Sequence, residues 1–161
     1  MKLLKHTVRL LVAATLITAP LAGFAEDKKM DEPALMQPVK SVYESYLKIQ
    51  AELAKDSIKG VDENASAIAK AVRSDEMKML APDVAKQADA LAKAKDLKAA
   101  REAFKPLSAS LIKYLADNKA GKDTYHETYC PMVKASWLQA DKSIKNPYMG
   151  KEMLTCGSFK N

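Results

Sequence analysis

The sequence has few of the residues on which enzyme signatures depend. Its 161 residues include two histidines, two cysteines and five glycines, and 6% are aromatic. It contains no glycine-rich phosphate loop, no GxSxG elbow, no HExxH motif and no CxxC pair. His126 and Cys130 fall on one side of an alternating stretch, but no residue in the sequence is placed to orient the histidine as a base. We therefore expect a protein that is not an enzyme.

Long hydrophobic runs are absent after the first 25 residues. Lys2, Lys5 and Arg9 precede the apolar stretch "LLVAATLITAPLAGF", and a polar segment follows it. This layout is typical of a cleaved secretory signal, and the run is shorter than the roughly 20 residues that a membrane span requires. We predict a signal peptide over residues 1–25, a periplasmic location and no membrane span after the signal is removed.

Neither sign of charge dominates the mature chain. The whole chain has 26 basic and 20 acidic side chains, for a net charge of +6. The predicted signal removes three basic residues, which leaves 23 basic against 20 acidic side chains, or +3. Because the lysines are interspersed with acids, the pattern predicts a solvated surface and no nucleic-acid partner.

The rest of the chain reads as one domain. Residues 26–36 are polar and contain a proline, which predicts a flexible lead-in. The length of the mature chain suits a single hydrophobic core, and no segment repeats at a fixed period. We predict one helical domain over residues 37–161 that ends in a cap over residues 124–159.

Hydrophobic periodicity predicts four helices. Apolar residues recur at spacings of three and four from Gln37 onward, and Gly60 is the expected end of the first helix. Three residues mark the beginnings of the others: Asp62, Pro82 and Asp96. Pro106 lies inside the fourth helix and predicts a kink or a break there. The expected fold class is all-α, a small antiparallel helical bundle.

The cap has a different pattern. "TYHETYC" alternates and is rich in aromatic and β-branched residues, so we expect a short extended segment that ends at Cys130. "GKEMLTC" predicts one or two helical turns, which would place Met149, Met153 and Cys156 on one face. Trp137 is expected to anchor this irregular cap on the bundle.

Soft ligand atoms gather in this cap. The candidate metal-binding residues are Cys130, Met132, Met149, Met153 and Cys156, with His126 as a borderline member. Thiolate and thioether sulfurs favour Cu(I) or a similar soft ion, and imidazole also suits copper. These residues also have alternative roles that involve no metal, because methionine commonly fills gaps in a core and histidine commonly lies at the surface.

The two cysteines also permit a different interpretation. Outside the cytosol, two thiols can oxidise to a disulfide, and an even count of two allows one bridge, Cys130–Cys156. An oxidised pair cannot supply two thiolates to a metal, so the two interpretations compete for the same sulfur atoms. The sequence leaves both open.

The spacing of the tail resembles a known family. The helical part contains the pattern "R..F..LS", and the tail contains "YCPM…WLQ…I.NPY.G..ML.CG". The chain is similar in these patterns to the periplasmic family known as domain of unknown function 3347, over residues 38–159. The residues that carry the resemblance are Arg101, Phe104, Leu107, Ser108, Tyr129, Cys130, Pro131, Met132, Trp137, Leu138, Gln139, Ile144, Asn146, Pro147, Tyr148, Gly150, Met153, Leu154, Cys156 and Gly157.

The resemblance implies an association with metals. Family members occur alone or fused to adaptor subunits of copper and silver efflux pumps, which favours Cys130, Met132, Met153 and Cys156 as ligands. The position of Met149 is often aromatic in relatives. We therefore expect an exported protein that sequesters Cu(I) or delivers it to an efflux adaptor. The alternative is a disulfide-stapled periplasmic protein-interaction module without metal.

Overall fold

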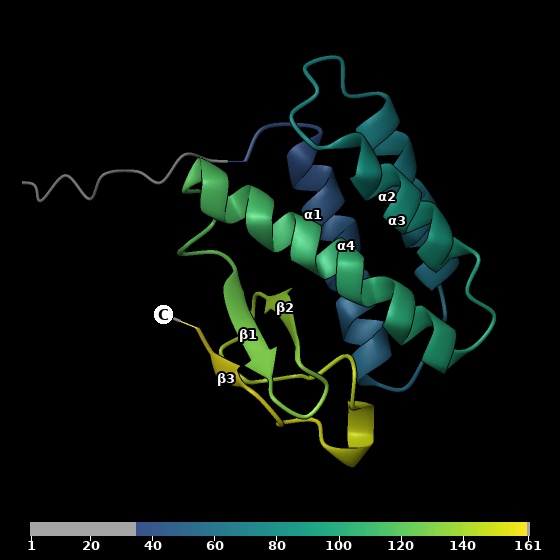
Figure 1. Ribbon diagram of the computed structural model, residues 1–161, viewed down its shortest axis with the longest axis vertical. Helices are drawn as coiled ribbons and strands as arrows, with labels where there is room; N and C mark the ends of the chain where they lie inside the picture. Colours follow the sequence, from purple (N-terminus) through teal and green to yellow (C-terminus); the bar gives the residue numbers. More distant parts are fainter. Residues whose placement is uncertain (1–34, 161) are drawn as a thin grey trace, which may run out of the picture.

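The computed structural model describes residues 35–160, so the predicted signal peptide and most of the lead-in lie outside the described residues. Four helices come first along the chain, and three short strands follow (Figure 1). The helices are α1 (Val39–Ala54), α2 (Val61–Arg73), α3 (Pro82–Ala92) and α4 (Leu97–Asn118). The strands are β1 (His126–Cys130), β2 (Ala135–Gln139) and β3 (Ser158–Phe159), and the 3-10 turn η1 (Gly150–Glu152) lies between β2 and β3.

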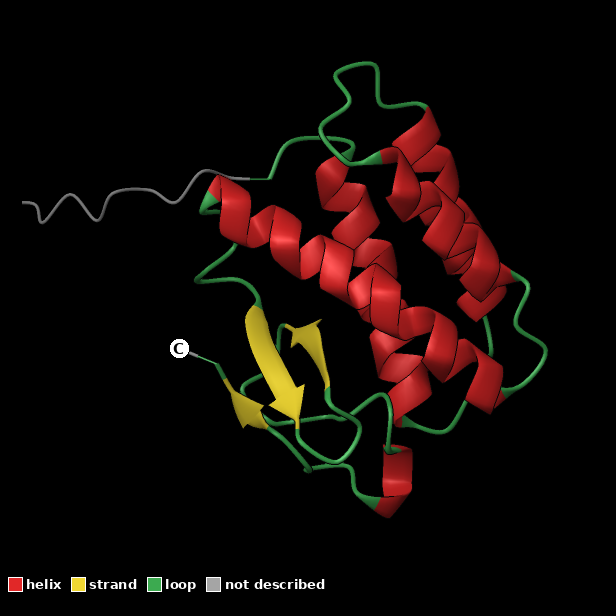
Figure 2. Ribbon diagram, in the orientation of Figure 1, coloured by secondary structure: helices red, strands yellow, loops and turns green. Residues whose placement is uncertain are grey.

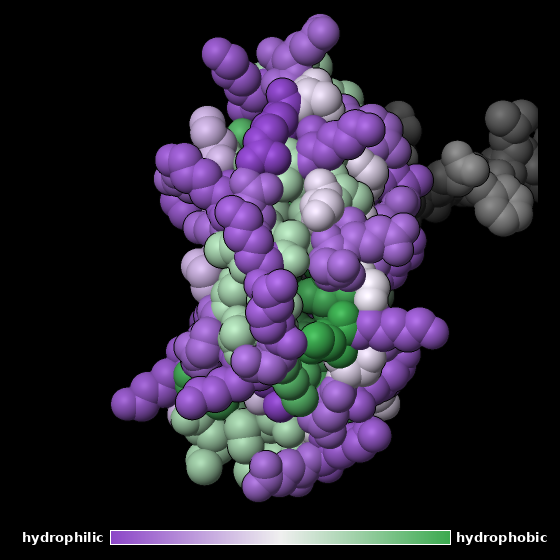
Figure 3. Space-filling model, turned by 90° about the vertical axis from the view of Figure 1, so that its right-hand side faces the viewer, coloured by the Kyte–Doolittle hydropathy of each residue, from purple (hydrophilic) through white to green (hydrophobic). Residues whose placement is uncertain are grey.

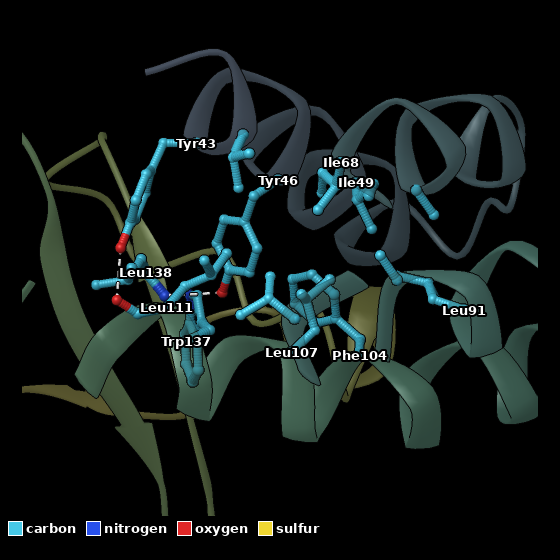
Figure 4. Close-up of a cluster of buried hydrophobic side chains, with 14 of the residues drawn as sticks. Tyr43, Tyr46, Ile49, Ile68, Leu91, Phe104, Leu107, Leu111, Trp137 and Leu138 are labelled. Atoms are coloured by element: carbon cyan, nitrogen blue, oxygen red, sulfur yellow. Dashed lines mark hydrogen bonds between the residues drawn. The ribbon is translucent and has the colours of Figure 1, made fainter. Parts of the chain in front are cut away.

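The four predicted helices are present, and each packs on the next one along the chain. Their shared core is apolar and includes aromatic side chains from α1, α4 and β2 (Figure 4). Tyr46 stacks on Phe104 with ring centroids 4.8 Å apart, so α1 and α4 are joined through an aromatic contact. The fully buried large side chains include Tyr43, Tyr46, Ile49, Leu53, Ile68, Leu91, Phe104, Leu107, Leu111 and Trp137.

The helix ends follow the sequence signals in part. Asp96 caps α4 as expected, because its carboxylate accepts a hydrogen bond from the Ala99 N–H at 2.8 Å. The prediction that Gly60 ends the first helix is wrong. Helix α1 ends at Ala54, and Gly60, with φ of 71°, is the N-cap residue of α2. Glycine is most common just after a helix but also occurs at N-caps, so the residue type alone does not distinguish the two ends.

Pro82 occupies the first turn of α3, as predicted. Helix α4 has 22 residues and continues through Pro106, so of the predicted kink or break the break does not occur. The buried positions Phe104, Leu107 and Leu111 lie on both sides of the proline and hold the helix against the core.

The prediction of an all-α fold is imprecise, because residues after α4 form an antiparallel sheet with the strand order β2-β1-β3 (Figure 2). The expected extended segment is β1, and it forms a hairpin with β2 in which Cys130 lies opposite Ala135. Alternation along β1 buries Thr128 and Cys130 as expected. The sequence "ASWLQ" of β2 was not recognised as a strand.

Tyrosine hydroxyls connect β2 to α1 and to the tail loop that precedes η1. The Leu138 N–H donates to the Tyr46 hydroxyl at 3.1 Å, and the Tyr148 hydroxyl donates to the Ser136 carbonyl at 2.8 Å. Figure 4 shows Tyr46 reaching from α1 toward Leu138 and Trp137. Trp137 is fully buried, which confirms its predicted role as an anchor of the cap.

Hydrophilic side chains cover most of the face shown in Figure 3, and hydrophobic atoms gather in its lower half. Within residues 35–160, none of the helices combines the length and the apolar character that a membrane crossing requires.

Candidate functional site

The fold brings the two cysteines together. Cys130 is the last residue of β1, and Cys156 follows η1 in the tail. Their sulfur atoms are 3.2 Å apart, although 26 positions separate the residues along the chain. Both are free thiols, and they differ in accessibility: Cys130 is completely buried, whereas Cys156 is partly exposed. The result is a pair with one protected sulfur and one that solvent reaches.

Hydrogen bonds favour the ionised form of one thiol. Burial alone raises the pKa of the Cys130 thiol, but hydrogen bonds to its sulfur outweigh this effect and lower the pKa from its ordinary value. In order of effect, the donors are the Val133 N–H, the Cys156 thiol, the Asn146 side-chain amide and the Met132 N–H. Two of these donors are N–H groups of the tight turn between β1 and β2, so this turn stabilises the thiolate form of Cys130.

The pKa of the second thiol, Cys156, shifts in the opposite direction. The pKa of the Cys156 thiol is raised, first because its S–H donates to the sulfur of Cys130, then by burial and by the negative charge that Cys130 carries when ionised. The proton of the pair is thus held by the more exposed sulfur. Such a pair is suited to thiol–disulfide exchange or to binding a soft cation.

Asn146 holds the loop that carries the second cysteine. Its side chain is completely buried, and its amide oxygen accepts hydrogen bonds from the N–H groups of Tyr148 at 2.8 Å and Met149 at 3.1 Å. Its amide nitrogen donates to the Cys156 carbonyl at 2.7 Å. One asparagine therefore fixes the turn "NPYMG" and the position of Cys156 together.

Arg101 fastens this loop to the bundle. Its guanidinium donates to the Pro147 carbonyl at 2.8 Å and to the Asp56 carboxylate at 2.6 Å. The Asp56 carboxylate in turn accepts a hydrogen bond from the Lys151 N–H at 3.1 Å. Gly150 is required here because a Cβ on it would lie 1.8 Å from the carboxylate of Asp56. The contact joins the α1–α2 link, α4 and the cap.

The other predicted metal ligands are placed less favourably than the two cysteines for binding an ion at the thiol pair. Met132, in the β1–β2 turn, has 65% of its surface exposed, and Met153 has 39% exposed. Met149 is partly buried against the hydrophobic core, which is the ordinary role of a methionine. His126 lies at the opposite end of β1 from Cys130, roughly 13 Å away at the rise of a strand, and packs edge-on against Phe159.

The predicted helical face of the cap does not form. After the single turn η1, residues 153–156 follow a turn conformation, so Met149, Met153 and Cys156 do not line up at helical spacing. The cause is Gly150, whose φ of 58°, together with the Asn146 bonds, commits this segment to a tight loop. Met153 still lies next to the pair along the chain, and its carbonyl accepts a hydrogen bond from the Cys156 N–H at 3.0 Å.

A conventional metal site is not found in the part of the chain that the structure describes. No three histidine, cysteine, aspartate or glutamate side chains within residues 35–160 lie close enough to hold a metal ion. Any metal bound at the thiol pair would therefore depend on sulfur atoms, with methionine as the additional donor.

Sequence reasoning assigned no role to Arg101, Asp56 or Asn146 in positioning the pair. Arg101 and Asn146 occur in the family pattern, so their positions were available, but their partners are backbone carbonyls and N–H groups that only the fold brings close. Asp56 has a φ of 61°, an unusual conformation outside glycine, and gave no signal in the sequence.

The comparisons with known proteins give one family. The sequence profile of the family described as "Protein of unknown function (DUF3347)" matches residues 42–123, slightly more than half of the chain. The match covers the helices and ends before β1, so it rests on the helical part of the resemblance and does not include the cysteine-containing tail. No curated protein and no solved structure matches the chain significantly.

Proposed function

We propose that this chain, which belongs to the DUF3347 family, is an exported protein-interaction module whose C-terminal cap is closed by a Cys130–Cys156 disulfide. The observation that carries the proposal is the contact of 3.2 Å between the two sulfur atoms. A disulfide requires sulfurs about 2.05 Å apart, so a shift of roughly 1 Å would close the bond. The leader-like N-terminal sequence supports export to a compartment in which such bonds persist.

The closed cap would present a surface for a partner. The bond would join the end of β1 to the tail and would hold the β1–β2 turn beside the loop that contains Met153. Met132 and Met153 are among the few large hydrophobic side chains exposed in residues 35–160, and both lie next to the pair in sequence. Exposed methionines adapt to varied partner surfaces, so this end of the molecule is the candidate contact site.

A second candidate function is binding of Cu(I) by the reduced pair. The specific observation is the set of donors that lowers the pKa of Cys130, because a metal ligand must be a thiolate. Two ligands at about 2.3 Å on opposite sides of an ion require sulfurs roughly 4.6 Å apart, so the pair would have to separate. A bent site with a third sulfur, from Met153 or Met132, would require a smaller change. The role would be sequestration, or delivery to a periplasmic efflux adaptor.

One experiment distinguishes the two functions. The mature protein is isolated from the periplasm without reductant, and its free thiols are alkylated under denaturing conditions and counted by mass spectrometry. The interaction module requires a chain that is lighter by two hydrogens, carries no alkyl group and takes no Cu(I) from a chromophoric chelator. Two free thiols with stoichiometric copper would overturn that proposal and support the second function.

Matched variants sharpen the result. If copper binds at the pair, Cys156→Ser abolishes binding and Met153→Leu weakens it, whereas Met77→Leu, at an exposed methionine in the α2–α3 link, has no effect. For the interaction module, a photo-crosslinker at position 132 captures a partner protein in the periplasm and one at position 77 does not. Equal capture at both positions would contradict a specific contact surface.

A further inference from the structure

A groove runs between α4 and the β1–β2 hairpin, and neither cysteine lines it. Its central part has a volume of about 480 Å³, which lies in the range of sites for small organic molecules. Pro106, Ala109 and Ile112 line it from α4, and Ala135 and Ser136 line it from β2. The groove does not involve the cysteines, so its ligand is independent of the proposed disulfide.

The helix side of the groove is apolar because of residue spacing. Pro106, Ala109 and Ile112 follow one another at intervals of three and therefore lie along one face of α4. Ala109 is exposed, so its small side chain leaves the groove open at its centre. Proline has no N–H, and the carbonyl of Glu102 consequently lacks the partner that residue 106 would otherwise supply.

Lysines surround this apolar strip. Lys105, Lys113 and Lys134 line the groove together with one acid, Glu127, so positive charge is in excess. Lys134 forms no ion pair with any residue that the structure describes. Lys105 and Lys113 pair only with acids of their own helix at the solvent-exposed surface, and such pairs contribute little and are readily exchanged for another anion.

The hollows on either side continue the same chemistry. The one toward the beginning of α4 shares Lys105 and adds Lys98, Arg101 and the buried Tyr148. The one toward the end of α4 shares Ile112 and Glu127 and adds Leu115 and Lys160. Hollows thus lie along α4 on both sides of the groove, and of the cations that they add, Arg101 is paired with Asp56 and Lys160 with Glu127.

We propose that the α4 groove binds a small organic anion with an apolar body, of the class of medium-chain carboxylates. The argument is charge complementarity: the apolar strip fits a hydrocarbon chain, and the excess of lysines fits a carboxylate. A neutral molecule would leave the ammonium group of Lys134 without a counter-charge, and an amine would be repelled by the lysines.

The test is a calorimetric titration of the reduced full-length mature protein with decanoate. We expect saturable binding of one molecule, no comparable binding of decyltrimethylammonium, and an affinity that falls with added salt. Lys134→Glu should weaken decanoate binding about tenfold, because it replaces an attraction by a repulsion near the surface. Lys70→Glu, at an exposed position of α2 outside the groove, is the charge-matched control and should leave the affinity unchanged.

Filling the groove provides a test that does not depend on charge. Ala109→Trp should abolish decanoate binding, and Ala67→Trp, at an exposed alanine of α2, should not. Both variants are accepted only if their circular dichroism and unfolding midpoint match the parent protein. Equal binding by Ala109→Trp and Ala67→Trp, or equal binding of the cationic and anionic amphiphiles, would overturn the proposal. Concentration-dependent dimerisation abolished by Ala109→Trp would also overturn it, because a second copy would then occupy the groove.

Discussion

Asn146→Ala removes the residue that organises the cap. The substitution deprives three backbone groups of their partners: the N–H groups of Tyr148 and Met149, and the carbonyl of Cys156. Each hydrogen bond contributes about 1 kcal/mol, and a buried group left without a partner costs about 1–3 kcal/mol. Water will reach part of the loop, so we expect a loss of about 3 kcal/mol in the free energy of unfolding.

The assay is urea denaturation under reducing conditions, followed by circular dichroism and by the fluorescence of Trp137, the only tryptophan in the chain. With a slope of roughly 1.5 kcal/mol per molar urea, a loss of about 3 kcal/mol lowers the midpoint by about 2 M without a change in slope. Asn118→Ala is the control, because the Asn118 amide bonds only to the Tyr114 carbonyl at the exposed end of α4. Its effect should stay within about 0.5 kcal/mol.

Asn146→Asp distinguishes the hydrogen bonds that the side chain accepts from those that it donates. A carboxylate still accepts from the two N–H groups, but it cannot donate to the Cys156 carbonyl or to the sulfur of Cys130. We expect intermediate stability and a raised pKa of the Cys130 thiol, because a donor is lost and a negative charge is placed beside the sulfur. If Asn146→Ala unfolds at the same urea concentration as Asn118→Ala, Asn146 does not hold the cap and the reasoning is refuted.

Other predictions concern pH, backbone conformation and thiol reactivity. Burial raises the pKa of three tyrosines far above the ordinary value near 10: Tyr43, Tyr46 and Tyr148. Above pH 10 these tyrosines keep their protons in the folded chain, whereas the unfolded chain loses three. The free energy of unfolding should therefore fall by about 4 kcal/mol per pH unit. Tyr46→Phe should reduce that slope by about one third in urea titrations at pH 9–11, and an unchanged slope would contradict the assignment. Gly150→Ala should lower the melting temperature more than Gly60→Ala: both positions have positive φ, but only the Cβ at 150 meets an atom at 1.8 Å, against 3.7 Å at 60. Cys130→Ser should accelerate alkylation of Cys156 at pH 8, because the hydrogen bond that raises the Cys156 pKa is removed, and an equal rate would show that the sulfurs do not interact.

The helices were predictable because their signals are local. An apolar stripe at spacings of three and four, Pro82 in a first turn and Asp96 as a cap each depend on residues within one or two turns. The end of the first helix was not predictable from Gly60, because a glycine with a left-handed conformation can either follow a helix or precede one. A rule based on local sequence predicts that Pro106 interrupts the helix. It does not include the packing of the buried side chains before and after the proline, which keeps α4 continuous.

The sheet and the cap depend on distant partners. The last three residues of β2 are all buried, both polar and apolar: Trp137, Leu138 and Gln139. The strand therefore lacks the alternation of buried and exposed residues by which a sequence pattern identifies a strand. Its hydrogen bonds are completed by β1 and by Tyr46, which lies 92 positions from Leu138. The pairing of Cys130 with Cys156 could be listed from the sequence as one option, but the donors that set their pKa values could not, because these are backbone groups of a tight turn.

The family match and the thiol pair lie in different parts of the chain, yet the contacts make them one unit. Within residues 42–123, which the profile matches, Gln50 donates to the Lys145 carbonyl at 2.6 Å and Arg101 donates to the Pro147 carbonyl. The hydroxyl oxygen of Ser108, which is completely buried, lies 3.3 Å from the hydroxyl oxygen of Tyr148. These contacts give polar groups of α1 and α4 part of their hydrogen-bond partners in the cap, and an unpaired buried group would be costly. The part of the chain that the family profile matches therefore forms one half of the interface on which Cys130 and Cys156 are held in contact.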